Sequence, residues 1–234
     1  MRKIQRTLVY GLCVIGFAGG LAACSDFVDD NDNTPYPSPA QVSFYNASPS
    51  APQVTVTVDE KSFLNAPLDY THFSGYLNFY TGNRHFKFKN GSNTLVDTTL
   101  LLKNNTTYSV FVINHNENIE TVVTTDTANV PNAGKAMVRF MQLSPDVDQI
   151  DVAFEGDAEN TFAALDYKEG SVFKEVTARK LKVVMKNADT DDEVLTSGEI
   201  TLQPGRYYTI ISRGYKTPPQ GNTNTLSVQV VAND

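Results

Sequence analysis

The chain contains two thiols, Cys13 and Cys24, and the second lies where a thiol can be modified. Cys24 directly follows Leu21-Ala22-Ala23, the end of an apolar run over residues 8–23 that is preceded by basic residues: Arg2, Lys3 and Arg6. A transmembrane helix needs roughly 20 apolar residues, so this run is short for a span. We therefore expect residues 1–23 to be a signal peptide that is removed, leaving Cys24 at the new N-terminus.

The small-residue site that ends in Cys24 resembles a bacterial lipobox, in which the cysteine is lipidated. This interpretation predicts lipid attachment at Cys24. Cys13 leaves with the leader, so the mature chain has no thiol for catalysis or metal binding and no disulfide, although it is exported. The alternative is an ordinary secretory leader cleaved elsewhere, with Cys24 an odd thiol.

Residues 24–39 form the predicted tether, which is first acidic and then rich in proline. The acidic part, Ser25-Asp26-Phe27-Val28-Asp29-Asp30-Asn31-Asp32, resembles the signal by which some Gram-negative bacteria of the gut-anaerobe type export lipoproteins outward, although Phe27-Val28 interrupts the acidic run. The same composition would also give a solvated spacer. We expect an outer-membrane lipoprotein displayed on the cell surface, with a periplasm-facing position as the alternative.

The charge of the chain restricts its partners. Removing the leader, which holds three basic residues and no acid, changes the formal net charge from −7 to −10. Such a surface repels nucleic acid and anionic headgroups, so we expect no nucleic-acid partner. Membrane attachment is expected through the N-terminal lipid, and the oligomeric state is left open.

No catalytic or cofactor-binding constellation is recognisable in the remaining sequence. The histidines His72, His85 and His115 share no metal-ligand spacing and fall in one half of the chain, so they are interpreted as surface or edge-strand residues. The acidic segment 189–193 could supply oxygen ligands to calcium, but its position between two apolar runs favours a solvated hairpin turn. We expect no cofactor, no metal and no enzymatic activity.

Two short motifs suggest modification. Asp97-Thr98-Thr99 and Asp126-Thr127-Ala128 resemble the acceptor used for O-glycosylation of exported proteins in the gut-anaerobe group. Thr127 is the better candidate, because a linker is exposed and flexible enough to enter a modifying enzyme. Thr98 is the second candidate.

From residue 40 onward, short alternating segments rich in valine, threonine and aromatic residues predict strands. Val54, Val56 and Val58 alternate with polar residues, as do Phe86 and Phe88. No long segment has helical periodicity. The chain is therefore predicted to be all-β.

Ordered landmarks at a nearly constant offset indicate an internal duplication. Val42-Ser43-Phe44-Tyr45-Asn46-Ala47-Ser48-Pro49 aligns with Val138-Arg139-Phe140-Met141-Gln142-Leu143-Ser144-Pro145, and Asn105-Thr106-Thr107-Tyr108 aligns with Gly205-Arg206-Tyr207-Tyr208. We expect two tandem immunoglobulin-like antiparallel β-sandwich domains, repeat 1 over residues 40–126 and repeat 2 over residues 136–234, joined by a linker over residues 127–135.

These landmarks resemble domain-of-unknown-function family 4397. The pattern of V-x-F, Ser-Pro, V-x-V, a D-Y segment, Ser-x-aromatic and a turn before a Tyr-rich strand fits repeat 2 well. Repeat 1 fits less closely, with Ser50 in place of the aspartate after Ser-Pro and Asn104-Asn105 in place of Pro-Gly. The resemblance implies tandem Ig-like modules on secreted or lipid-anchored bacterial proteins, and it transfers no catalytic residues.

The repeated motifs are interpreted as structural. The Ser-Pro pairs end strands, and Gln203-Pro204-Gly205-Arg206 is typical of a turn with glycine at positive φ. The aromatic residues are expected to form the cores rather than a ligand platform: Phe44, Phe79, Phe86, Phe88 and Tyr108 in repeat 1, and Phe140, Phe154, Phe173 and Tyr207 in repeat 2.

Two functions remain open at this point. The first is a non-enzymatic cell-surface adhesion or binding module with a glycan or protein ligand, held by the end loops over residues 46–53, 143–149 and 215–224. The second is a structural spacer or accessory subunit of an envelope complex. A hydrolase is the third and weakest hypothesis, and the fold class does not distinguish among them.

Overall fold

The computed structural model describes residues 38–114, 118–157, 159 and 161–233. Within these residues every element from β1 to β19 is a strand, so the all-β prediction is confirmed. None of the described residues belongs to a helix with the length and apolar character needed to cross a membrane. The predicted signal peptide, Cys24 and nearly all of the tether lie outside the described residues, as does His115.

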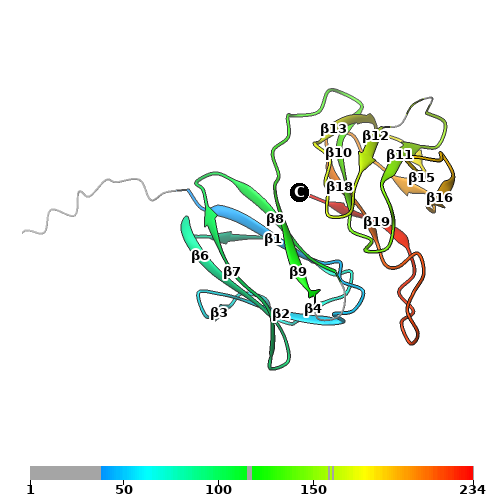
Figure 1. The fold of residues 1–234 in the computed structure, drawn as a ribbon. Coiled ribbons are helices and arrows are strands. Elements are labelled where there is room, and N and C mark those ends of the chain that lie inside the picture. The colour runs from blue at the N-terminus through cyan, green and yellow to red at the C-terminus, as the bar shows by residue number, and fades with distance from the viewer. Residues whose placement is uncertain (1–37, 115–117, 158, 160, 234) are drawn as a thin grey trace, which may run out of the picture. The chain divides into compact units, whose positions relative to one another are not determined.

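The first half of the fold contains two sheets. One has the order β5-β1-β8-β9, and the other has the order β3-β2-β6-β7 with β4 paired to β2 (Figure 1). Their strands are β1 (Ala40–Asn46), β2 (Gln53–Val58), β3 (Lys61–Ser62), β4 (Leu68–Asp69), β5 (Phe73–Phe79), β6 (Gly82–Asn90), β7 (Asn93–Leu102), β8 (Thr107–Ile113) and β9 (Glu120–Thr125).

The second half repeats this plan. Its sheets have the orders β13-β10-β18-β19 and β12-β11-β15-β16, with a short β14-β17 pair. The strands are β10 (Lys135–Gln142), β11 (Ile150–Phe154), β12 (Phe162–Leu165), β13 (Lys174–Thr177), β14 (Lys180–Leu181), β15 (Val183–Asn187), β16 (Glu193–Thr196), β17 (Ile200–Thr201), β18 (Tyr207–Arg213) and β19 (Ser227–Ala232).

One sheet in each half combines parallel and antiparallel pairing. β1 runs parallel to β8, with Phe44 opposite Val110, and β10 runs parallel to β18, with Phe140 opposite Ile210. The other pairs between the described strands are antiparallel, as predicted. The mixed pairing brings the first strand of each repeat to the middle of its sheet.

Each half has its own apolar core between its two sheets. Phe44, Phe86 and Phe88 are fully buried in the first, and Phe140 and Phe154 are buried in the second. The sheets that contain β2 and β11 are purely antiparallel, and these two strands alternate between buried and less buried residues. That alternation is typical of strands with one face on a core and the other toward solvent.

The strands of the mixed sheets are buried almost continuously instead. β1, β8, β10 and β18 each contain a run of at least five buried residues. A third apolar cluster explains this pattern, because it joins the two halves: Tyr45, Ala47, Phe111, Ile113, Met141, Leu143, Ile211 and Val231. The described residues accordingly belong to a single compact unit, Pro37–Asp234.

The Ser-Pro motifs have the same structural role in both repeats. Ser48 Oγ donates to the carbonyl of Asn114 at 2.7 Å, and Ser144 Oγ donates to that of Gly214 at 2.6 Å. Both serine residues are fully buried. The hydroxyl therefore ties the turn after the first strand to the end of β8 or β18, in agreement with the structural interpretation of these motifs.

The turns before β8 and β18 also correspond. Gly205 has φ 78°, as predicted for its turn, and Asn105 takes φ 52° at the equivalent place in repeat 1. Tyr108 and Tyr208 then each accept a backbone N–H, from Lys103 and Gln203 respectively, at 3.1 Å. Both copies thus have a turn residue that tolerates positive φ, followed by a tyrosine whose hydroxyl accepts a backbone N–H from the turn.

Candidate functional site: the cleft between the repeats

The candidate site is a cleft of about 490 Å³ lined by residues of both repeats. Its walls include Gln41, Tyr76, Thr107, Asp126, Ala128, Phe173, Tyr207 and Asn233. Small-molecule sites usually measure about 300–1,000 Å³ and combine aromatic walls with a few placed polar groups. The cleft has the size of such a site and three aromatic wall residues, and its lining is more polar than that of most small-molecule pockets.

Equivalent positions of the two repeats meet in this cleft. Tyr76 and Phe173 correspond, because each lies two residues after a serine whose Oγ accepts a strand N–H at 2.9 Å, from Phe44 or Phe140. Asp126 and Asn233 also correspond, since each donates its backbone N–H across the sheet to Thr107 or Tyr207. Matched pairs of positions from the two halves therefore line the cleft.

A buried ion pair lies beside the cleft and includes one of its wall residues, Asp126. Arg139 Nη1 lies 2.5 Å from Asp126 Oδ1, and the two side chains are 3% and 4% exposed. Asp126 follows β9 in repeat 1 and Arg139 lies on β10 in repeat 2. Such a pair is retained only where hydrogen bonds satisfy the remaining polar atoms of both groups.

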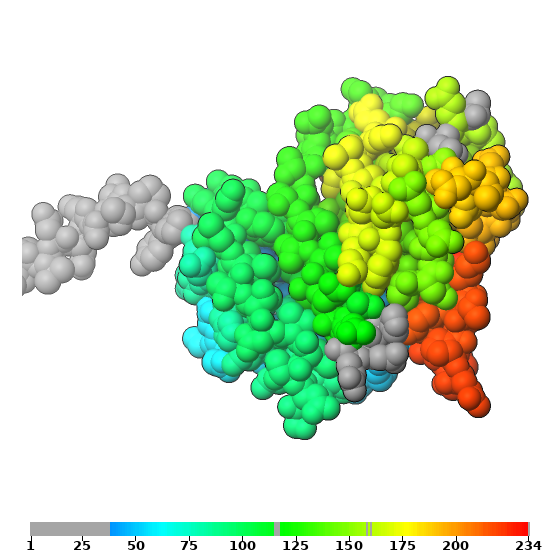
Figure 2. Space-filling view, in the orientation of Figure 1, coloured from blue at the N-terminus to red at the C-terminus, as the bar shows by residue number. Residues whose placement is uncertain are grey.

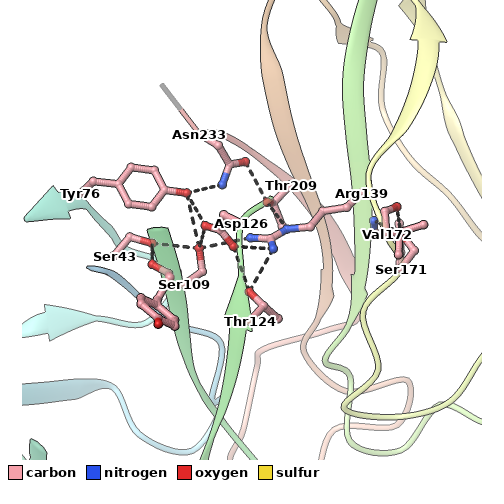
Figure 3. A network of polar contacts seen from close by, with 12 residues as sticks. Ser43, Tyr76, Ser109, Thr124, Asp126, Arg139, Ser171, Val172, Thr209 and Asn233 are labelled. Carbon is pink, nitrogen blue, oxygen red and sulfur yellow. Dashed lines mark hydrogen bonds and ion pairs between the residues drawn. The ribbon is translucent and has the colours of Figure 1, made fainter. Parts of the chain in front are cut away.

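Hydrogen bonds supply those partners (Figure 3). Asp126 Oδ2 accepts from Tyr76 OH and Ser109 Oγ, both at 2.6 Å, and Oδ1 accepts from Thr124 at 3.1 Å. The other donors of the Arg139 guanidinium reach hydroxyl groups at 2.9–3.2 Å: those of Thr209, Thr124 and Ser109. The network holds the side chains of the wall residues Tyr76 and Asp126 in place.

The same network contacts two aromatic residues of the cleft wall, Tyr76 and Phe173. Asn233 Nδ2 donates to Tyr76 OH at 2.6 Å. The guanidinium carbon of Arg139 lies 4.8 Å from the centre of the Phe173 ring, and that ring meets Tyr207 edge-to-face at 6.5 Å. Burial, and next the negative charge of Asp126, raise the pKa of Tyr76 to about 12, so this hydroxyl stays protonated at neutral pH.

The structure corrects the core prediction for Phe173 and Tyr207. Both are partly exposed and line the cleft, whereas Tyr208 lies in the second core. Successive side chains of a strand point to opposite faces, so Tyr207 faces away from the core that Tyr208 enters. The Tyr-Tyr pair in the sequence could have indicated this division.

The three predicted binding loops are brought together, and the first residues of two of them are buried. Asn46, Ala47, Ser48, Leu143 and Ser144 have no exposed surface. The contact between the halves and the strand-end hydrogen bonds cover these five residues, whereas other residues of the same loops, such as Gln53 and Asp148, are exposed.

The third loop, residues 215–224, extends beyond its neighbours between β18 and β19 (Figures 1 and 2). Its base is fixed to both other loops. Asn222 and Asn224 each donate to the carbonyl of Pro49, at 2.9 and 2.8 Å, and Asp146 accepts the backbone N–H groups of Lys216 and Thr217 at 2.7 and 2.8 Å. The side chains of Lys216 and Thr217 are exposed, and so is Gln220 farther along the loop.

The predicted modification sites differ in accessibility. Thr127 is exposed and follows the end of β9, while the carboxylate of the preceding Asp126 is buried in the network. Thr98 is half-buried within β7, opposite Phe86 of β6. Thr127 therefore remains the more accessible of the two candidates.

The acidic turn and the histidines form no metal centre in the described part of the chain. Residues 189–192 lie in the predicted hairpin turn between β15 and β16, and Glu193 begins β16. Lys186 is paired to Asp191 at 2.9 Å. His72 is exposed, and His85 contacts Asp97 on the neighbouring strand. Among the described residues, no group of three or more His, Cys, Asp or Glu side chains could hold a metal ion.

Comparison with solved structures gives only weak similarities. A carbohydrate-binding module of family 26 from Eubacterium rectale Amy13K, solved with maltoheptaose, is 9% identical with a TM-score of 0.26, covering 78% of this chain and all of that one. A structure described as α-glucan binding by a streptococcal virulence factor is 12% identical with a TM-score of 0.24, covering 74% and 92%. A putative cell adhesion protein from Bacteroides eggerthii is 8% identical with a TM-score of 0.17, covering 84% and 95%.

Scores this low carry no functional argument. No curated protein matches the chain. The model of one protein family matches the chain. The matched residues extend from β1 through most of β11 and include the predicted linker. Residues 40–153 match the family described as "Domain of unknown function (DUF4397)", which confirms over this range the family resemblance inferred from the sequence.

Proposed function

We propose that this chain is a non-enzymatic surface lipoprotein that acts as a binding or adhesion module, with its ligand held in the cleft between the repeats. The observation that carries the proposal is the cleft itself, in which aromatic and polar side chains from both repeats surround about 490 Å³. The Arg139–Asp126 network supports it, because a preorganised site loses little conformational freedom on binding.

The binding proposal is tested with the unlipidated full chain, Cys24→Ser, on an array of glycans and of host and bacterial envelope proteins. We expect a ligand whose signal falls with Tyr207→Ala and is unchanged by Tyr80→Ala. Tyr80 is a suitable control because it is 82% exposed and does not line the cleft. Signals no stronger than those of a peptide spanning residues 24–39 would contradict the proposal.

The location of the protein is proposed from the sequence. In this proposal Cys24 carries the lipid, residues 24–39 form the tether, and residues 40–126 and 136–234 are two copies of one domain displayed at the outer membrane. Several acyl chains are needed, since each buried CH₂ contributes only about 0.8 kcal/mol. We expect Cys24→Ser to abolish fatty-acid labelling and to release the protein from the membrane fraction.

Protease shaving of intact cells distinguishes the two orientations. Loss of the folded region without lysis supports surface display. Protection of that region until the outer membrane is opened supports the periplasm-facing alternative and argues against adhesion.

A structural role in an envelope complex is the second proposal. The buried cluster and the ion pair between the halves favour it, because they make the described chain one compact unit suited to act as a spacer. Stable co-purification of envelope proteins after crosslinking, unaffected by Tyr207→Ala, is the expected result. Absence of any crosslinked envelope partner would oppose it.

We also propose O-glycosylation at Thr127, with Thr98 as the second candidate. Thr127 has the exposure that a modifying enzyme needs. An added mass on the exported protein that disappears in Thr127→Ala would support the proposal. A mass accounted for by peptide and lipid alone would contradict it.

A further inference from the structure

We propose that the cleft and the cavity beside it form one groove that binds a neutral saccharide chain. This inference rests on the proposed binding function and names the ligand class of that site. Its basis is the wall residues that the two cavities share, the chemistry of their walls and the distribution of charge around them.

The two cavities are adjacent because they share wall residues. The second cavity measures about 260 Å³ and is lined by Pro39, Gln41, Asn78, Asn105, Thr106 and Thr107. Gln41 and Thr107 also line the cleft. In this proposal a ligand longer than one unit runs from the aromatic cleft, past Gln41 and Thr107, to the turn at Asn105.

The side chains of the groove match the chemistry of a sugar. Amide groups offer both donors and acceptors, and threonine hydroxyls do the same, which suits a ligand covered with hydroxyl groups. Such side chains dominate the second cavity, whereas the cleft adds the rings of Tyr76, Phe173 and Tyr207. Aromatic rings provide large apolar surfaces on which the C–H face of a pyranose can pack.

The charges around the groove select a neutral ligand. Among the described residues that line the two cavities there is no lysine, arginine or histidine, and the one acid is Asp126. The Asp126 carboxylate is already paired with Arg139 and bonded to three hydroxyl groups. An anionic ligand would lose hydration without gaining a cationic partner, and a cationic ligand would find the one carboxylate neutralised.

The inference is tested by titrating the full chain, as Cys24→Ser, with neutral oligosaccharides of increasing length and with uronate-containing or sulfated chains of similar length. Binding is followed by calorimetry and by tyrosine fluorescence, which is readable because the chain has 11 tyrosines and no tryptophan. We expect a neutral chain to bind, and Tyr207→Ala to weaken it by about tenfold or more.

Two further variants make the test specific. Asn105→Gly deletes an amide in the second cavity while keeping the positive φ of 52°, which glycine adopts freely. It should weaken longer chains and leave the shortest ligand unchanged. Tyr80→Ala is the matched tyrosine control and should change nothing.

The outcomes separate the two levels of the proposal. Binding of an acidic chain or of a protein in a Tyr207-dependent way, without a neutral saccharide, overturns this inference and leaves the binding function standing. If neither Tyr207→Ala nor Asn105→Gly changes the affinity for saccharide, the saccharide does not bind in the proposed groove. Absence of any ligand in the saccharide series and on the array overturns both.

Discussion

Arg139 and Asp126 occupy positions at which the two repeats differ. Arg139 aligns with Ser43, and Asp126 corresponds to Asn233, so one copy supplies the base and the other the acid. Repeat 1 has no basic residue at the position of Arg139, and repeat 2 has no acid at the position of Asp126. The equivalent pair, Ser43 and Asn233, therefore cannot form a second ion pair.

Removing one partner of this pair should be costly. Arg139→Ala leaves the Asp126 carboxylate buried and uncompensated, which predicts a loss of about 3–5 kcal/mol in the free energy of unfolding. Arg179→Ala is the matched control, since Arg179 pairs with Asp157 at the surface, and it should cost less than about 1 kcal/mol. Chemical denaturation measures both, and equal losses would contradict the prediction.

Tyr76 predicts a dependence of stability on alkaline pH. Its pKa in the folded protein is about 12 against an ordinary value of 10.0. A raised folded pKa means that the stabilising contribution is complete below pH 10 and is lost as the pH rises from there through about 12.

The measurement is the unfolding free energy of the native chain and of Tyr76→Phe across that pH window. We expect the native chain to lose more stability than the variant between pH 10 and 12, and the tyrosinate absorbance to show one fewer late-titrating group in Tyr76→Phe. Parallel pH profiles for the two proteins would show that Tyr76 does not titrate in this way.

At the scale of elements, the loop between β18 and β19 illustrates how backbone geometry positions a candidate surface. Gly214 has φ 82°, and a Cβ placed on it would lie 2.2 Å from the carbonyl oxygen of Thr225. Gly221, near the tip of the same loop, has φ 83° but no heavy atom within 4 Å of such a Cβ. The base of the loop is therefore closed by backbone contact, whereas the tip is open.

The two glycines form a matched pair for mutation. Both alanine variants carry the strain of a left-handed backbone, but only Gly214→Ala also forces two backbone segments apart. We expect Gly214→Ala to lower the free energy of unfolding by about 1–3 kcal/mol more than Gly221→Ala. Faster amide hydrogen exchange at Tyr215 and Leu226 in Gly214→Ala, but not in Gly221→Ala, would show that the base of the loop has been disrupted. Equal losses of stability in the two variants would contradict the prediction.

At the scale of the whole molecule, the contact between the halves should make them unfold together. The third apolar cluster includes Tyr45 and Phe111 from one half with Met141 and Ile211 from the other, all at most 2% exposed. Neither mixed sheet can lose its partner without exposing this surface. One cooperative transition is therefore expected for residues 38–233.

Met141→Lys tests this coupling by placing a charge in the cluster. A buried unpaired charge is strongly unfavourable, so we expect the halves to separate and the single transition to split into two. Val130→Lys adds the same charge at a residue that is 84% exposed and should leave one transition. Two transitions in the native chain, or one in Met141→Lys, would show that the halves are not coupled through this cluster.

Several features of the fold were predictable because their signals are local. Alternating residues such as Val54, Val56 and Val58 predicted a strand with one buried face, and the structure confirms it. The turn at Gly205 required a residue tolerant of positive φ, and the Ser-Pro pairs end β1 and β10 as expected. Each of these features depends on a few neighbouring residues.

The sequence by itself determined the all-β class, strands such as that at Val54–Val58 and the turn at Gly205, because periodicity and backbone restrictions act over short distances. Only the tertiary structure decided that the two mixed sheets cover each other, that Asp126 meets Arg139, and that Phe173 and Tyr207 line a cleft instead of a core. A run of buried residues such as that in β10 indicates that both faces are covered, but not by what. Segments far apart in the sequence provide the surface that covers β10. The cleft is likewise lined by residues that are distant in the sequence.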